Sequence, residues 1–240
     1  MRLEPLSEFP PFKVARPVMR QTWTELSFLH WPLEPAKVRP LVPAALDLDL
    51  YDGAAWVGLV PFLIEDLTLP KAPAVPWLSN FPETNVRTYV TDQNGGRGVW
   101  FFSLDAARLI AVLGARAMYG LPYYWARMNV VPSNHSVRYF SRRYSGSHAH
   151  TEIEIAKGPP VAKPSELEIF LTARFRLYAL RGKRLVKAEI EHQPWQLHQS
   201  VVSTLNQSLV TTAGFPGLGI PPFAHFGGRV DVRVGRPQIL

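Results

Sequence analysis

The stretch ETNVRTYVTDQNGGRGVWFFSL (83–104) carries the pattern that most directly indicates the fold. Its first part, 83–91, alternates between two kinds of side chain, as a β-strand does when successive residues point to opposite faces. Its last part, 98–104, is rich in the β-branched and aromatic residues that strands favour. The turn DQNGG between them is typical of a β-hairpin. The stretch therefore predicts two neighbouring antiparallel strands.

The first of these strands has two chemically different faces. Glu83, Asn85, Arg87 and Tyr89 share one face, whereas every residue on the other face from 84 to 90 is a threonine or a valine. The second face suits packing in a core. The first face is either the outer, solvated side of a sheet or the wall of an interior cavity. In the second case its polar groups must satisfy each other or a ligand, because an unpaired buried group costs about 1–3 kcal/mol.

Short alternating segments punctuated by 23 prolines and 16 glycines continue along the chain. They predict further strands over 24–31, 54–64, 123–131, 136–144, 150–158, 169–180, 184–193 and 229–235. Pro61 indicates a sheet edge or a bulge. Helices are expected over 33–43, over 103–120 with Ser103 or Asp105 as its cap, and over 199–214.

Many strands, two or three helices and no alternation of strand with helix indicate a mostly β protein of the β-rich α+β class. The strand pattern favours an antiparallel sheet or barrel. We expect a single domain over residues 1–240, because no low-complexity linker divides the chain.

The composition narrows the classes of function. The chain contains no cysteine, which removes disulfides, thiol nucleophiles and thiolate metal sites. A net charge of +7 could attract nucleic acid, but the basic residues are scattered and no nucleic-acid-binding motif is present. No apolar run approaches the roughly 18 residues of a membrane helix, and the first residues lack the apolar core of a signal peptide. We therefore expect a cytoplasmic protein that binds neither nucleic acid nor membrane.

The stretch GLPYYWARM (120–128) places unusual chemistry directly after a predicted helix. Gly120 suits the left-handed end of a helix, and a proline two residues later prevents its continuation. In the strand that follows, Tyr123, Trp125 and Arg127 share one face, opposite Tyr124. Two rings and a cation can bind a ligand, and they can equally form a structural cluster in which the arginine pairs with a nearby acid.

Other reactive patterns are weak. The segment EIEHQPWQLHQS contains His192, Trp195 and His198, but no nucleophile elbow, metal-binding histidine pair or phosphate loop accompanies them. The histidines lack a ligand spacing, so no metal is expected. The lysines lie in turns or polar contexts, which is not where a Schiff-base amine is activated. No cofactor is implied.

Several ordered motifs resemble a known family. They are FLHWPLEPAKVRPLVPAALDLDLYDGAAWVGLVPF, NVRTYV, GVWFFSLDAARLIAV, YGLPYYWARM and EHQPWQL, which together span almost the whole chain. They are similar to the YqjF-like group of uncharacterised bacterial proteins, within the acetoacetate decarboxylase-like superfamily. The resemblance implies an antiparallel, cone-like β-barrel around a central cavity.

The resemblance also implies which chemistry is missing. Acetoacetate decarboxylases carry a Gly-x-Pro-Lys-Lys motif whose first lysine forms an imine with the keto acid. The matching positions here end in Tyr123 and Tyr124, and a phenol cannot form an imine. Glu83 is similar in position to a cavity glutamate of those enzymes. Their substrate-binding arginine near the first strand has no counterpart, because the chain reads His30, Trp31 and Pro32.

Two functions therefore stand side by side. In the first, the cavity binds a small carbonyl or carboxylate compound for lyase- or hydrolase-type acid/base chemistry without a Schiff-base lysine. In the second, it is a non-catalytic binding or sensing module for an apolar or aromatic ligand. A small molecule is the expected partner, and assembly into a homo-oligomer stays open. The candidate catalytic residues are Glu83 and Tyr123, and the candidate binding residues are Trp31, Asn85, Arg87, Trp100, Tyr124, Trp125 and Arg127.

Overall fold

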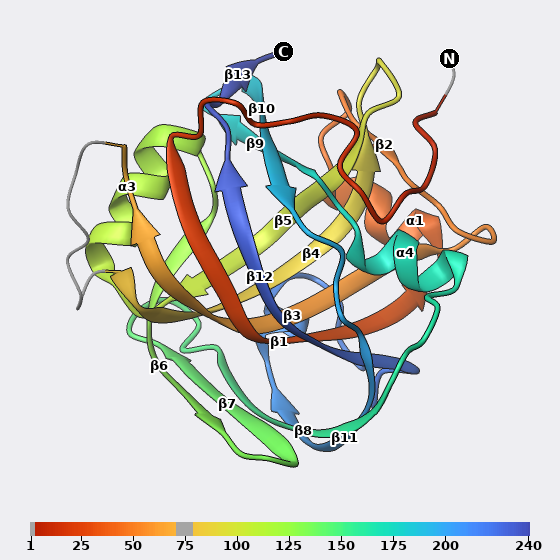
Figure 1. The fold of residues 1–240 in the computed structure, drawn as a ribbon. Helices are drawn as coiled ribbons and strands as arrows, with labels where there is room; N and C mark the ends of the chain where they lie inside the picture. The colour runs from red at the N-terminus through yellow and green to blue at the C-terminus, as the bar shows by residue number, and fades with distance from the viewer. Residues whose placement is uncertain (1–2, 71–78) are drawn as a thin grey trace.

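The computed structural model describes residues 3–70 and 79–240. Strands dominate it (Figure 1). The strands are β1 (Met19–Leu33), β2 (Asp47–Leu48), β3 (Ala55–Thr68), β4 (Phe81–Thr91), β5 (Arg97–Ala106), β6 (Tyr123–Pro132), β7 (Ser136–Arg143), β8 (His150–Pro160), β9 (Arg176–Arg181), β10 (Arg184–His192), β11 (His198–Gln207), β12 (Phe223–Val234) and β13 (Gln238–Ile239). The helices are α1 (Pro35–Val38), the 3-10 turn η1 (Arg39–Leu41), α3 (Leu109–Tyr119), α4 (Glu166–Thr172) and α5 (Leu209–Thr212).

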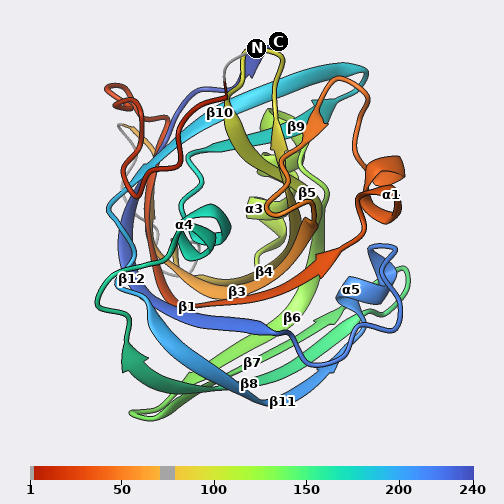
Figure 2. The ribbon, with the colours of Figure 1, turned by 90° about the vertical axis from the view of Figure 1, so that its right-hand side faces the viewer.

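The strands of the described residues form one 13-stranded sheet that closes on itself. Its order is β13-β10-β9-β5-β6-β7-β8-β11-β12-β1-β3-β4-β2, and β4–β5 and β10–β12 pair in addition. These extra pairings join β12, β1, β3, β4, β5, β9 and β10 into a ring (Figure 2). The sheet is mostly antiparallel, as the strand pattern predicted, but the fully antiparallel barrel that the resemblance implied needs correction, because β5 pairs in parallel with both β6 and β9.

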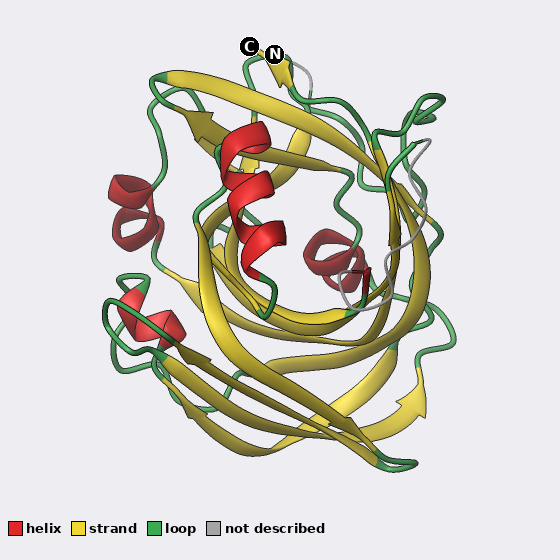
Figure 3. Ribbon diagram, turned by 90° about the vertical axis from the view of Figure 1, so that its left-hand side faces the viewer, coloured by secondary structure: helices red, strands yellow, loops and turns green. Residues whose placement is uncertain are grey.

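Two helices close the ends of this ring. The helix α4 lies within one opening (Figure 2), and α3 lies across the opposite one (Figure 3). Strands β6, β7, β8 and β11 form a curved flap outside the ring, and the short β2 and β13 pair with β4 and β10. The fold thus has an inner space inside the ring and a second layer between the ring and the flap.

The alternation predicted for 83–91 explains how one strand serves both spaces. Val86 and Val90 belong to the apolar core beneath the flap, together with side chains of β7 and β8. Glu83, Asn85 and Arg87 line the inner space of the ring. Both faces of β4 are therefore buried, and the polar face is not the solvated outer side of a sheet.

Several element predictions need correction. The helix expected over 103–120 begins only at Leu109, because Asp105 continues strand β5 and pairs with buried Arg143 at 2.7 Å. The helix expected over 199–214 is mostly strand β11, followed by the short α5. The described residues hold four α-helices and one 3-10 helix, where two or three helices were expected.

The strand expected over 169–180 begins instead as helix α4. Ser165 accepts a hydrogen bond from the backbone of Glu168, and the Glu168 side chain accepts one from the backbone of Ser165. This reciprocal pair is a capping box, which starts a helix. The pattern Ser-x-x-Glu was present in the sequence, and it outweighs the β-favouring residues that follow it.

Pro61 lies at an irregularity, as its position predicted. The pairing of β3 with β1 shifts register between Leu59 and Leu63, so Pro61 has no partner in β1. On its other side Pro61 pairs with Thr84 of β4. Pro61 therefore lies beside a bulge, one of the places in a sheet where proline is tolerated.

Candidate active site

The inner space of the ring is a cavity of about 100 Å³. One water molecule needs only about 10–15 Å³ of such space. The inner cavity therefore has room for a small organic molecule. Its walls are mainly aromatic and aliphatic, with side chains such as Trp23, Phe28, Phe62, Phe101 and Trp195. The polar lining residues are Gln21, Glu83, Asn85, Arg87, Tyr119, Tyr123, Thr172, Arg174 and His192.

Glu83 and Tyr123 meet at one side of this cavity. The Tyr123 hydroxyl donates a hydrogen bond to Oε2 of Glu83 at 2.7 Å. Strand β5 brings them together, because Glu83 pairs with Ala106 on one side of β5 and Tyr123 pairs with Leu104 on the other. The pairing of an acid with a phenol here thus follows from the three-strand arrangement β4-β5-β6.

Burial changes the protonation chemistry of this pair. Desolvation raises the pKa of the Glu83 carboxyl to about 7, although the hydrogen bond from Tyr123 favours the charged form and opposes the shift. Burial and the neighbouring Glu83 raise the pKa of the Tyr123 phenol well above its ordinary value. At neutral pH Glu83 therefore exchanges its proton readily, while Tyr123 stays protonated.

A tight turn at the end of α3 places Tyr123. Gly120 adopts a left-handed conformation with φ of 74°, and its N–H donates to the carbonyl of Arg116 at 3.0 Å. Nε of Arg116 in turn donates to the carbonyl oxygen of Tyr123 at 2.7 Å. A β-carbon on Gly120 would lie 2.3 Å from the carbonyl oxygen of Leu180, so only glycine fits.

Arg87 and Arg174 form a cationic region elsewhere on the cavity wall. Both guanidinium groups lie over the ring of Tyr89, at 5.6 and 4.7 Å from its centroid. Arg174 follows helix α4 and pairs with buried Asp49 at 2.6 Å. Arg87 donates to the carbonyl oxygen of Leu171 at 3.1 Å, and it forms no ion pair with any carboxylate of the described residues.

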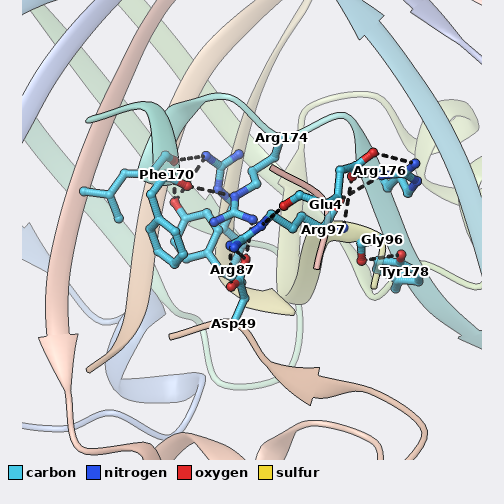
Figure 4. A network of polar contacts seen from close by, with 11 residues as sticks. Glu4, Asp49, Arg87, Gly96, Arg97, Phe170, Arg174, Arg176 and Tyr178 are labelled. Carbon is cyan, nitrogen blue, oxygen red and sulfur yellow. Dashed lines mark hydrogen bonds and ion pairs between the residues drawn. The ribbon is translucent and has the colours of Figure 1, made fainter. Parts of the chain in front are cut away.

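A chain of ion pairs behind the cavity holds Arg174 in place (Figure 4). Asp49 accepts from Arg174 and also from Arg97, at 2.6 Å in each case. Arg97 Nε donates to the backbone carbonyl of Glu4 at 2.7 Å, and the Glu4 carboxylate pairs with Arg176. The Asp49 carboxylate thus pairs with both Arg97 and Arg174, whereas neither Asp49 nor Glu4 pairs with Arg87.

Besides Nε1 of Trp23, three polar atoms of cavity-lining residues are buried without a partner. They are Nε of Arg87, Nη2 of Arg174 and Oδ1 of Asn85. The side chains belong to residues only 8%, 6% and 4% exposed, so solvent outside the protein does not satisfy them. Leaving such groups unpaired is costly, which indicates that the cavity is built for a polar occupant.

His192 is a buried imidazole in the wall of this cavity. Burial, with a smaller contribution from the nearby Arg87 guanidinium, lowers the pKa of His192 to about 4, against the hydrogen bond that His192 makes with the Gln193 carbonyl. His192 is therefore neutral at physiological pH. Its neighbour Trp195 donates its indole N–H to the carbonyl oxygen of Thr172 at 3.0 Å.

Four of the predicted site residues line the cavity, and five do not. Glu83, Asn85, Arg87 and Tyr123 are part of its wall. The other five lie outside this wall. They are Trp31, Trp100, Tyr124, Trp125 and Arg127.

Strand geometry explains why these five side chains lie outside the cavity wall. Val99 and Phe101 face the cavity, so Trp100 between them faces the core beneath the flap. Trp31 lies in the same second core, where its indole N–H donates to the carbonyl oxygen of Gly219 at 2.9 Å.

Strand β6 leaves the ring just after its first residues and turns to pair with β7. Arg127 therefore lies on the surface. Trp125 packs on Tyr144 at 4.2 Å, and the ring of Tyr124 lies 3.7 Å from the Arg143 guanidinium.

The sequence interpretation did not assign Arg174 or His192 to the site. Arg174 was hidden because 169–180 was assigned to one strand, whereas the chain turns into the cavity after α4. His192 and Trp195 stood out in the segment EHQPWQL, but no spacing connected them with β4. Among the described residues, no cluster of three or more histidine, aspartate or glutamate side chains is arranged to hold a metal ion. No helix in the described part of the chain is long and apolar enough to cross a membrane.

Comparison with solved structures places this fold among the acetoacetate decarboxylase-like proteins. The enduracididine biosynthesis enzyme MppR in complex with pyruvate matches with a TM-score of 0.68 at 12% identity, over 93% of this chain and 91% of that one. An acetoacetate decarboxylase from Legionella pneumophila matches with a TM-score of 0.66 at 13% identity, over 98% and 90%. An acetoacetate decarboxylase-like enzyme from Sphingomonas wittichii RW1 matches with a TM-score of 0.66 at 11% identity, over 96% of each chain.

Sequence comparison gives a nearer relationship. The uncharacterized protein YqjF of Bacillus subtilis is 38% identical over 220 residues, which cover 90% of this chain and 89% of that protein. The model of family DUF2071, described as an uncharacterized conserved protein, matches residues 20–231. The ring of strands, its cavity and these matches agree, and the chain belongs to the DUF2071 family.

Proposed function

We propose that the cavity binds a small carboxylate compound that also carries a carbonyl group, and that Arg87 receives the carboxylate. The observation that carries this proposal is the burial of the Arg87 guanidinium in the cavity wall without an acid partner among the described residues. A buried cation without a counterion is costly, and a ligand carboxylate would supply that counterion. The guanidinium groups of Arg87 and Arg174, which both line the cavity, would donate to its oxygens.

Glu83 and Tyr123 are the groups that we assign to proton transfer. Above a pH of about 7 the Glu83 carboxylate would accept a proton from the carbon next to the ligand carbonyl. The electron pair of that C–H bond would move into the carbonyl, and Tyr123 would donate a hydrogen bond to the resulting enolate oxygen. Glu83 would then return the proton, so the step needs no imine.

The similarity in fold supports this assignment without defining a reaction. The closed ring is consistent with a cone-like barrel around the cavity, as in acetoacetate decarboxylases. The MppR structure contains pyruvate, which is both a carboxylate and a ketone. These relatives are too distant in sequence to transfer a substrate, so the chemistry of the lining residues remains the main support.

A non-catalytic binding or sensing role is the second candidate. None of the residues that line the cavity is a lysine, cysteine or serine, so the described wall offers no amine, thiol or serine nucleophile. Ligand binding by Arg87 and the aromatic wall would suffice for such a role. The two candidates share the ligand site and differ in whether Glu83 moves a proton.

Calorimetric titration with acetate, pyruvate and acetoacetate tests the ligand site. Arg87→Met should weaken binding of these acids by about 10- to 100-fold, because a hydrogen-bonded charge contributes about 1.5–3 kcal/mol. Arg127→Met is the matched control, since Arg127 lies on the surface. Equal affinities for the wild type and Arg87→Met would contradict the proposal.

Following the same acids by NMR separates the two candidates. Exchange of the protons next to the carbonyl for deuterium, or conversion to a product, supports acid/base catalysis if Glu83→Gln abolishes it while ligand binding persists. Binding without exchange or conversion in the wild type supports the sensing role.

A further inference from the structure

A second, apolar cavity of about 250 Å³ adjoins the inner one, on the side of α3. It lies between this helix and the strands β1, β3 and β4. The two cavities share six lining residues, namely Met19, Gln21, Ile64, Ala115, Tyr119 and Tyr123. Tyr123 thus stands at the junction, with its hydroxyl on Glu83. The cationic inner cavity and the outer cavity are therefore neighbouring parts of one space.

The outer cavity differs chemically from the inner one. None of its fourteen described lining residues carries a charge, and only Gln21, Tyr119 and Tyr123 bear polar side-chain groups. The Tyr119 hydroxyl is already used, because it donates to the carbonyl oxygen of Gly235 at 3.2 Å. Such a wall offers little to a polar ligand and suits a hydrocarbon.

The rim of the outer cavity points to the same kind of occupant. Ile110 and Met118 of α3 line this cavity and are 56% and 46% exposed. The flexible thioether side chain of Met118 at the mouth of the cavity is suited to packing around a chain of variable shape. Gly114, between them on the helix, leaves open space where a side chain would otherwise project.

We propose that the natural ligand is an amphipathic carboxylic acid, with its carboxylate at Arg87 and its hydrocarbon tail in the outer cavity against α3. This inference rests on the proposed carboxylate site and adds the class of ligand. Glu83 and Arg87 are four residues apart on β4, so about 13 Å of strand separates their positions. An acid that extends from Arg87 no further than Glu83 stays in the inner cavity, whereas a longer chain reaches the outer one. The tail would pass the Glu83–Tyr123 pair on its way out.

Calorimetry with butanoate, hexanoate, octanoate and decanoate tests this inference, at concentrations below micelle formation. In the wild type each added methylene in the apolar walls should tighten binding about fourfold, so decanoate should bind at least about 100-fold more tightly than butanoate. Gly114→Leu should keep the affinity for butanoate but lose most of the gain for decanoate. Leucine is also a better helix former than glycine, so the helix should persist.

Ala117→Leu is the matched control, because Ala117 is exposed on the same helix and lines neither cavity. It should behave like the wild type. Affinities that do not depend on chain length, or that Gly114→Leu leaves unchanged, would overturn the assignment of the tail and leave the carboxylate site standing. Failure of every acid to bind, butanoate included, would refute the carboxylate site itself and the tail with it.

The same proteins are also examined by light scattering for their oligomeric state. If the wild type is an oligomer that Gly114→Leu dissociates, a second copy of the chain covers the outer cavity, and the tail assignment is overturned. An oligomeric state that is the same in the wild type, Gly114→Leu and Ala117→Leu supports the assignment of this space to the ligand.

Discussion

At the scale of single residues, the two arginines of the cavity are held very differently. Arg174 has a buried carboxylate partner in Asp49, and its Nε donates to the carbonyl oxygen of Phe170 at 2.8 Å. Arg87 has only carbonyl and hydroxyl oxygens around it, among them Leu171 and Tyr89. Arg174 is therefore part of the folded framework, whereas Arg87 is the cation that we propose a ligand carboxylate neutralises.

This difference predicts opposite effects on stability. Arg87→Met should leave the free energy of unfolding of the ligand-free protein unchanged or raise it by about 1–2 kcal/mol, because it removes a buried charge without breaking an ion pair. Arg174→Met should lower it by about 3 kcal/mol, because Asp49 then keeps only Arg97. Urea denaturation of both variants measures the contrast. A loss of stability in Arg87→Met as large as in Arg174→Met would show that Arg87 is structural.

Glu83 predicts a second effect, in the dependence of stability on pH. Its folded pKa of about 7 lies above the ordinary value of 4.5, so the folded state binds a proton that the unfolded state has released. The stability contributed by protonated Glu83 is therefore complete below pH 4.5 and is lost as the pH rises to 7. Glu83→Gln should be more stable than the wild type by about 3 kcal/mol at pH 8 and equally stable near pH 4.

In the wild type, His192 also contributes to the dependence of stability on pH. Its pKa is lowered to about 4, so its contribution has the opposite sign and is lost as the pH falls from 6.5 towards 4. The difference between Glu83→Gln and the wild type at each pH cancels the His192 contribution. A difference that does not change between pH 4 and pH 8 would mean that the Glu83 carboxyl is not perturbed by burial.

Sequence patterns alone predicted part of the cavity wall. Glu83, Asn85 and Arg87 could be predicted together because they share one face of a single strand. Tyr123 was found through the stop-and-proline motif before it. Arg174 and His192 could not be joined to them, because their approach depends on where α4 ends and how β10 closes the ring.

At the scale of elements, α3 and the turn that ends it position the junction of the two cavities. Gly120 should tolerate no side chain, because the added β-carbon would meet the Leu180 carbonyl and the backbone is left-handed. Gly120→Ala should cost at least about 2 kcal/mol. Gly114→Ala on the same helix meets open space and should stabilise by about 1 kcal/mol. Denaturation of the pair tests this, and equal effects at both glycines would disprove the account of the turn.

In two of the wrong element predictions, another interaction outweighed the intrinsic propensity of the residues. Residues 199–207 have both apolar periodicity and β-branched side chains, and pairing with β8 and β12 decides for a strand. Residues 166–172 contain β-favouring side chains, and the local capping box decides for a helix. Tertiary pairing in one case and a local cap in the other outweighed intrinsic propensity.

At the scale of the whole molecule, two cores share the same strands. The ring core and the core beneath the flap use opposite faces of β1, β3 and β4. Neither can lose its packing without exposing a face of the other. We therefore expect a single cooperative unfolding transition, in keeping with one domain over residues 1–240. Circular dichroism and tryptophan fluorescence should report coincident midpoints in urea, and two separate transitions would contradict this view.

The sequence patterns predicted a β-rich molecule, and the resemblance implied a barrel around a cavity, but neither showed which pairings close the sheet. The parallel pairing of β5 with β9 joins segments far apart in the chain, and that of β5 with β6 is reached through helix α3. No local pattern encodes such pairings. They are nevertheless what brings Tyr123 to Glu83 and completes the wall around Arg87.

The most direct test of the carboxylate site is a crystal structure of the protein grown with a saturating concentration of octanoate. The account predicts a carboxylate within hydrogen-bonding distance of the guanidinium groups of Arg87 and Arg174, with the chain directed past Tyr123 towards α3. An inner cavity that holds only water under these conditions, or a carboxylate bound away from Arg87, would contradict it.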